Sequence, residues 1–110
     1  MSIKIFILKS GEKIISDAKE ILKKDILNQT VEGYLLKDPH LIMMHRERVY
    51  LMEEDQNQDS GREIQVTLSP WIILTEDTEF AIPFDWVVTI AEPLNSIKTM
   101  YEDKVNGKSN

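Results

Sequence analysis

Two adjacent lysines, Lys23 and Lys24, are the first side chains in the sequence that could bind phosphate, and Asn28 follows close behind them. Lysine neutralises the negative charge of a nucleic-acid backbone. Glu20 and Asp25 lie among the same residues, so the pattern also fits an ordinary charged surface. This segment therefore indicates either a nucleic-acid contact or a solvated face.

A second group of basic residues contains His45, Arg46 and Arg48, and it is followed by Tyr50. Cations beside an aromatic ring on a sheet form a workable platform for single-stranded nucleic acid, because arginine neutralises phosphate while tyrosine stacks on a base. Glu47 interrupts the group, so interleaved surface charge is the alternative interpretation. The two groups together are the candidate nucleic-acid-binding residues.

Metal binding is suggested only by an acidic stretch in which Asp55, Asn57 and Asp59 alternate, as the first ligands of an EF-hand loop do. The rest of that pattern fails. Ser60 stands where the sharp turn needs glycine, and Val66 stands where the bidentate glutamate should be. We expect a solvated hairpin loop here and no bound metal.

Catalytic motifs are missing from the sequence. His40 and His45 are the only histidines, and five residues apart on a strand they point to opposite faces. We interpret both as polar residues near the exposed side of a strand. The sequence has no nucleophile elbow, no glycine-rich phosphate loop and no cysteine, so we predict a non-catalytic protein without a cofactor.

Length and composition indicate one small globular domain. The chain has 110 residues, of which 42% are hydrophobic and 29% are charged. No apolar run approaches the roughly 20 residues that cross a bilayer, and the first residues lack the layout of a signal peptide. We therefore expect a cytoplasmic protein that does not bind membranes.

Charge is distributed unevenly along the chain. The net charge is −6, but residues 1–50 carry +2 and residues 51–110 carry −8. An acidic protein repels phosphate backbones at long range. Any nucleic-acid site therefore has to be a local basic patch from the first half.

Runs of β-branched and aromatic residues, bounded by glycine, proline and polar turns, predict a mainly β fold. A hairpin is expected at Lys37–Pro39, because proline removes a donor from the ladder. After the acidic stretch we expect two more strands, the second of them entered from Phe80–Pro83. The predicted strands are Ile3–Leu8, Thr30–Leu36, His40–Met52, Glu63–Leu68 and Trp86–Ala91.

Two further segments complete this prediction. Residues 13–27 have apolar side chains at helical spacing, but some of them also share one strand face, so periodicity favours a helix without deciding. Residues 94–105 follow Pro93 and precede Gly107, and their apolar residues define one face of a C-terminal helix. Trp71 and Trp86 adjoin proline-marked turns, where tryptophan fills a core or a subunit interface.

The spacing of Leu8, Gly11, Ile14 and Ala18 resembles the first Sm motif of the Sm and Sm-like proteins. In that motif a strand ends in leucine, turns at glycine and returns through a second strand. Ser16 stands where the family usually has a glycine. The resemblance implies that residues 13–22 form a strand and not a helix.

A longer part of the chain resembles short Sm-like proteins of the marine cyanophage type. This resemblance implies a small, strongly bent antiparallel barrel over residues 1–92, a helix over 93–107 and a tail over 108–110. It also implies a homo-oligomeric ring of roughly five to seven subunits. The matching stretches are Leu8–Glu12, Gly33–Pro39, Ser69–Trp71, Ile82–Val88, Glu92–Pro93 and Met100–Gly107.

The RNA-contacting motifs of Sm proteins are only partly present. Asp25–Asn28 loosely matches the family's Asp-x-x-Met-Asn stretch, and Gly61-Arg62 reverses its Arg-Gly pair. The resemblance implies a ring that binds single-stranded RNA or DNA during phage infection. The alternative is a structural ring that docks a protein partner and makes no nucleic-acid contact.

Overall fold

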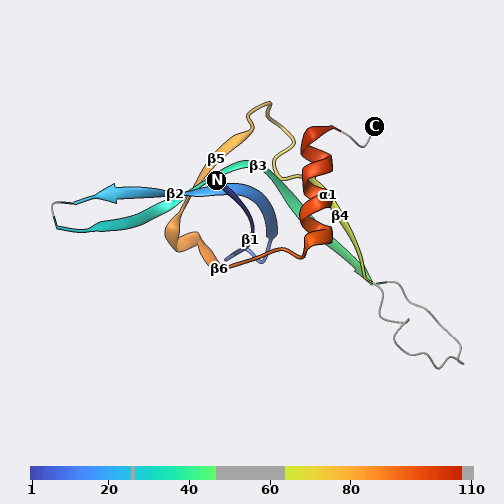
Figure 1. The fold of residues 1–110 in the computed structure, drawn as a ribbon, viewed down its shortest axis with the longest axis horizontal. Coiled ribbons are helices and arrows are strands. Elements are labelled where there is room, and N and C mark those ends of the chain that lie inside the picture. Colours follow the sequence, from blue (N-terminus) through green and yellow to red (C-terminus); the bar gives the residue numbers. More distant parts are fainter. Residues whose placement is uncertain (26, 47–63, 108–110) are drawn as a thin grey trace, which may run out of the picture.

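The computed structural model describes residues 1–25, 27–46 and 64–107. This part of the chain forms one antiparallel sheet and one C-terminal helix (Figure 1). The elements are β1 (Ser2–Leu8), β2 (Lys13–Lys24), β3 (Gln29–Arg46), β4 (Ile64–Pro70), β5 (Glu79–Pro83), the 3-10 helix η2 (Phe84–Trp86), β6 (Val87–Ala91) and α1 (Asn95–Asn106).

The strand order is β4-β3-β2-β1-β6, and β5 also pairs with β3. Each pairing is antiparallel. Within the described residues β5 and β6 do not pair with each other, so the sheet is not a closed barrel and the expected closure is not found. The chain passes from β5 to β6 through η2, and Lys9 N–H donates to Trp86 C=O there at 2.9 Å.

Two long hairpins give the molecule its elongated shape, with extents of 65 × 33 × 23 Å. The β2–β3 hairpin and the β3–β4 hairpin project from opposite sides of the bent sheet (Figure 1). We call the outer part of the β2–β3 hairpin, residues 19–25 and 27–33, the arm. Lys24 pairs with Gln29 near its tip.

Strand β3 does not end at Pro39, so the hairpin predicted at Lys37–Pro39 is wrong. The register with β2 shifts there, because Ile15 pairs with His40 while Asp17 pairs with Lys37. Asp38 takes a φ of +52°, which bends the strand at this bulge. Proline is tolerated because the bulge interrupts the ladder at that point.

Residues 13–24 form a strand, as the resemblance implied and against the helical periodicity. Ile14 and Ala18 are buried in one apolar cluster, whereas Ile15 is buried in another on the opposite face. A strand covered on both faces loses the simple alternation of apolar and polar residues. That is why its pattern was also compatible with a helix.

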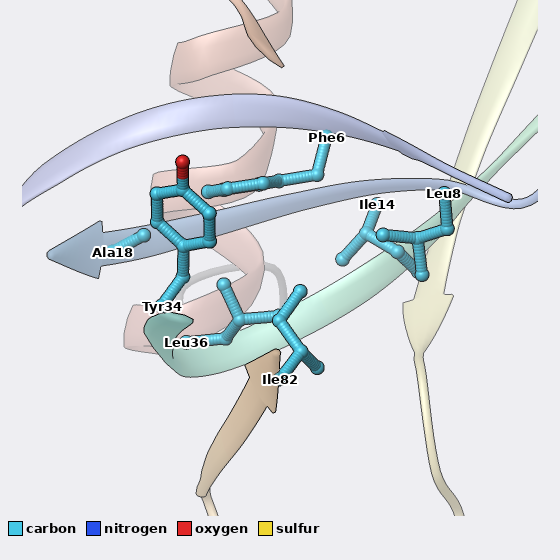
Figure 2. Packing of buried hydrophobic residues seen from close by; sticks show 7 residues of the cluster. All are labelled: Phe6, Leu8, Ile14, Ala18, Tyr34, Leu36 and Ile82. Atoms are coloured by element: carbon cyan, nitrogen blue, oxygen red, sulfur yellow. The ribbon is translucent and has the colours of Figure 1, made fainter. Parts of the chain in front are cut away.

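The main cluster lies inside the bend of the sheet, between β1, β2, β3 and β5 (Figure 2). The Phe6 and Tyr34 rings meet edge to face with centroids 5.4 Å apart. Leu8, Ile14 and Ala18 of the Sm-like motif are all buried here, and Gly11 makes the turn between β1 and β2 with a φ of +91°. The members of the cluster are Phe6, Leu8, Ile14, Ala18, Tyr34, Leu36 and Ile82.

The second cluster holds α1 on the outer face of the sheet. Tyr101 is buried against Ile15 and Leu68, and Ile97 and Met100 pack around them. The helix ends at Gly107 in the left-handed conformation, as the sequence predicted. No helix in residues 1–25, 27–46 and 64–107 is long and apolar enough to span a membrane.

The Tyr101 hydroxyl joins α1 to the bulge. It accepts a hydrogen bond from Asp17 N–H at 3.1 Å and donates one to Lys37 C=O at 2.9 Å. Ser16 is fully buried and its hydroxyl lies 2.9 Å from the same carbonyl oxygen. Burial is the largest of the effects that raise the pKa of Tyr101 to about 12.

Replacing Gly33 by alanine should destabilise the protein. A Cβ at this position would collide with the backbone carbonyl of Ile82 on the paired strand β5. Overpacking of this kind costs about 1–3 kcal/mol of unfolding free energy. Urea unfolding of Gly33→Ala beside the neighbouring Glu32→Ala measures the difference, and equal midpoints would contradict the close approach.

Replacing Tyr101 by phenylalanine should remove a pH-dependent part of the stability. Because the folded-state pKa is about 12 and the unfolded value is about 10, the folded state holds its proton more tightly. The wild-type free energy of unfolding should therefore decline from pH 10 towards pH 12, in addition to any change shared by both proteins.

Tyr101→Phe should be less stable at neutral pH by about 1–3 kcal/mol, because Asp17 N–H loses its partner. Its stability should fall less steeply above pH 10 than that of the wild type. Urea unfolding at pH 7, 10 and 11.5 provides the comparison. Parallel pH profiles for the two proteins would show that Tyr101 does not titrate as described.

Candidate functional site

The first group of predicted nucleic-acid residues lies at the tip of the arm. Lys23 and Lys24 end β2 and are exposed, in register with Thr30 and Gln29. Asn28 is also exposed, and its carbonyl accepts a hydrogen bond from Asp25 N–H at 2.8 Å. The tip of the arm thus presents both lysines and Asn28 at one end of the molecule.

The second group lies at the far end of β3. His45 is exposed, and its Nε2 is 3.5 Å from Thr67 Oγ1. Arg46 is the last residue of β3, in register with Ile64. Arg48 and Tyr50 lie outside the described residues, so their predicted part in the site is not placed.

The structure holds these two groups apart, because the arm and the β3–β4 hairpin point in opposite directions (Figure 1). One chain therefore cannot present both groups to the same few nucleotides. The arm also carries Glu20 and Glu32, so its charge is mixed. Each group has to act alone or together with copies from other subunits.

The two histidines lie in different surroundings, since His40 is buried and His45 is exposed. His40 is buried, contrary to its interpretation as an exposed polar residue; its Nδ1 lies 2.9 Å from Asp38 C=O, and its ring meets Tyr101 edge to face. Among residues 1–25, 27–46 and 64–107 no three histidine or acidic side chains could jointly hold a metal ion. The acidic stretch with Asp55, Asn57 and Asp59 lies outside this part.

The outer strands β5 and β6 offer a different kind of site. In the described part of the chain β5 pairs only with β3, and β6 pairs only with β1. Strand β4 is a third edge strand, because it also pairs only with β3. Exposed apolar side chains lie along and beside β6, including Val88 with 62% exposure and Trp86 with 42%. An uncovered strand edge flanked by apolar side chains is a template for pairing with another chain.

A second feature, which the sequence motifs did not indicate, is the segment Trp71–Thr78 between β4 and β5. We call it the apolar loop. Trp71 N–H donates to Pro39 C=O at 3.0 Å, and Asp38 N–H donates to Thr78 C=O at 2.7 Å. Both ends of the loop are therefore fixed to consecutive residues of β3. The available signal was the run of four apolar residues from position 71 to 74.

The apolar loop exposes its hydrophobic residues and anchors its aromatic one. Ile73 is 75% exposed and Leu74 is 91% exposed. Trp71 packs against the main cluster and meets Phe80 edge to face, which agrees with its predicted structural role. Consecutive exposed apolar residues on an anchored loop are characteristic of an interaction surface.

An open hollow of about 450 Å³ lies beside β6 at the edge of the main cluster. Tyr34 has a buried ring and lines the hollow, and burial together with Glu20 raises its pKa. We call this feature the β6 hollow. Its lining residues are Met1, Ser2, Lys4, Phe6, Ala18, Lys19, Glu20, Tyr34 and Ile90.

Residues 1–106 match the model of a protein family that is described as a family of unknown function, DUF6561. The chain belongs to the DUF6561 family. No curated protein matches this sequence. The matched residues of this DUF6561 protein include all the described helices and strands. The strand edges, the apolar loop and the β6 hollow therefore all lie within the region that defines the family.

Proposed function

We propose that this DUF6561 protein is a non-catalytic, Sm-like subunit that assembles with copies of itself into a ring and binds single-stranded nucleic acid. The observation that carries the proposal is the pair of uncovered edges on β5 and β6 in the described part of the chain. Pairing β5 of one copy with β6 of the next satisfies the backbone groups of both edges. A closed ring of roughly five to seven copies ends this growth.

Side chains beside the two edges support the assembly. Val88, Ile90 and Phe84 are all exposed in the single chain although they are large and apolar. Pairing at β6 would remove much of this surface from water, which stabilises the contact by roughly 25 cal/mol for each Å² buried. Trp86 then fills the interface position expected of it.

The Sm-like part of the proposal rests on features of the bent sheet. The motif residues Leu8, Ile14 and Ala18 lie in the core, and Gly11 makes the expected turn. In the sequence, strands β5 and β6 are separated only by the short helix η2. We interpret the sheet as an open form of the Sm-like fold, in which η2 connects β5 to β6 where a closed barrel would pair them.

The arm is the best-supported nucleic-acid contact. Lys23, Lys24 and Asn28 are exposed together at its tip. A ring repeats this tip in every subunit, so weak phosphate contacts act together. The group of His45 and Arg46 at the opposite end of the molecule is the second candidate for a nucleic-acid contact.

A ring that binds only protein partners is the second candidate function. The apolar loop and the net charge of −6 favour it, because both suit a protein surface better than a polyphosphate. The two functions share the same assembly. They differ in whether the arm contacts phosphate.

Replacing Val88 by lysine should weaken assembly. The substitution puts a charge on the exposed face of β6, where the proposed interface buries apolar surface. Light scattering at micromolar concentration should show a ring for the wild type and smaller species for Val88→Lys. Thr99→Lys on the exposed face of α1 adds the same charge elsewhere and should leave the ring intact.

A monomeric wild type under these conditions would contradict the ring. An intact ring in Val88→Lys would instead show that β6 is not the interface. Both variants should keep the circular dichroism of the wild type, because Val88 and Thr99 are exposed in the single chain.

Replacing Lys23 and Lys24 together by alanine should weaken binding to single-stranded oligonucleotides. Each lost phosphate contact lowers the slope of log affinity against log salt by about 0.7 for a single strand, so the slope should flatten by up to about 1.4. Fluorescence anisotropy over a salt series, with RNA and with DNA, measures this. Lys98→Ala with Lys104→Ala on α1 is the matched control.

Unchanged affinity in an assembled Lys23→Ala, Lys24→Ala protein would exclude the arm and direct attention to His45 and Arg46. No binding by the wild type at low salt would favour the protein-docking ring. Equal losses in the arm variant and the helix control would show a nonspecific charge effect.

A further inference from the structure

The apolar loop is built to keep its exposed residues in place. Its two ends are hydrogen-bonded to Asp38 and Pro39, and Asp77 N–H donates to Thr75 Oγ1 at 3.0 Å within it. Ile73 and Leu74 are nevertheless exposed to solvent. The ends of the loop are fixed, and its exposed side chains are therefore available to an external partner.

The β6 hollow is a suitable receptor for such side chains. Its lining mixes polar and apolar residues: Phe6 and Ala18 are buried there, and Ile90 contributes an exposed apolar side chain. An apolar cavity of about 150 Å³ is large enough to hold a benzene molecule. A hollow of about 450 Å³ therefore has room for two branched aliphatic side chains.

Strand direction brings the loop of one copy to the hollow of the next. In an antiparallel pairing of β5 with the β6 of another copy, the start of β5 lies beside the end of β6. Glu79 starts β5 directly after the apolar loop, and Ile90 lies near the end of β6 in the wall of the hollow. The exposed Leu94 follows β6 and extends the apolar surface.

Charge around the two surfaces is compatible with this contact. Glu76, Asp77 and Glu79 flank the exposed part of the loop. Lys4 and Lys19 line the hollow. Glu20 also lines it, and Glu92 forms an ion pair with Lys4, so the attraction is modest and apolar burial has to supply most of the binding.

We propose that the apolar loop of each subunit inserts Ile73 and Leu74 into the β6 hollow of the neighbouring subunit and so locks the ring. This inference rests on the proposed ring, and it assigns a role to a loop that the edge pairing alone does not require. The partner is a second copy of this chain, because the chain carries both the exposed apolar residues and a hollow that accommodates them.

The first test replaces both Ile73 and Leu74 by aspartate. Assembly followed by light scattering over a dilution series should require about tenfold or more higher protein concentration than in the wild type. Leu27→Asp removes a similarly exposed leucine at the arm tip and should assemble as the wild type does. Circular dichroism should be unchanged in both, because all three side chains are exposed.

The second test uses the absence of cysteine from the sequence. Copies carrying Leu74→Cys are mixed with copies carrying Ser2→Cys, at the lining of the hollow, under mild oxidation. A disulfide-linked heterodimer is expected. Leu74→Cys mixed with Thr99→Cys should give much less product.

The outcomes separate this inference from the proposed ring. An intact wild-type ring, normal assembly of the aspartate variant and no excess of the disulfide-linked heterodimer over the Thr99→Cys control would overturn the loop contact alone. A monomeric wild type that forms no such heterodimer would overturn both proposals. Binding of neutral lipid vesicles through Ile73 and Leu74, without the cross-link, would replace the neighbouring copy by a membrane surface.

Discussion

The hydrogen-bonded bulge where β2 meets the bend of β3 is the constraint on which the rest of the structure depends. Lys37 C=O accepts from the hydroxyls of both Ser16 and Tyr101, and Tyr101 in turn accepts from Asp17 N–H. These polar groups are withdrawn from water, so leaving one of them without a partner would cost more than a typical hydrogen bond contributes. The network therefore fixes the bend of the sheet and the position of α1 together.

The same bend determines what the protein exposes. Because β3 turns at Asp38 and Pro39, its first part pairs with β5 and its second part pairs with β4. The chain between those two strands is left as the apolar loop, held by backbone bonds to the same two residues. Helix α1 packs over the second part and β4, against Ile42, Leu68 and Val66. Within the described residues β5 and β6 each pair with one strand and keep one free edge. The bend, the apolar loop and the open strand edges thus arise together, and in the proposed ring a neighbouring copy covers the loop and the edges.

Local sequence patterns predicted the elements whose signals are local. The turn at Gly11 and the helix end at Gly107 both have a positive φ, and both were predicted at a glycine within a local motif. The hairpin predicted at Pro39 is wrong, because β3 accommodates a proline at its bulge. That bulge arises from pairing with β2, a strand distant in the sequence. The sequence identified the lysines of the arm as a basic group. It could not show that they lie apart from His45, because that separation depends on the directions of the β2–β3 and β3–β4 hairpins. The apolar loop was missed, since four apolar residues resemble a short buried strand until burial is known.

Charge and apolar surface respond to salt in opposite ways, and this separates the two activities of the proposed ring. Each copy carries a net charge of −6, so bringing several copies together is opposed by repulsion that salt screens. Apolar burial at β6 and at the hollow does not weaken in salt, and the ring should gain stability as the salt concentration rises. Phosphate contacts at the arm weaken under the same conditions, because counterion release contributes less. A protein that assembles more strongly while it releases nucleic acid would therefore be using two distinct surfaces, one apolar and one basic.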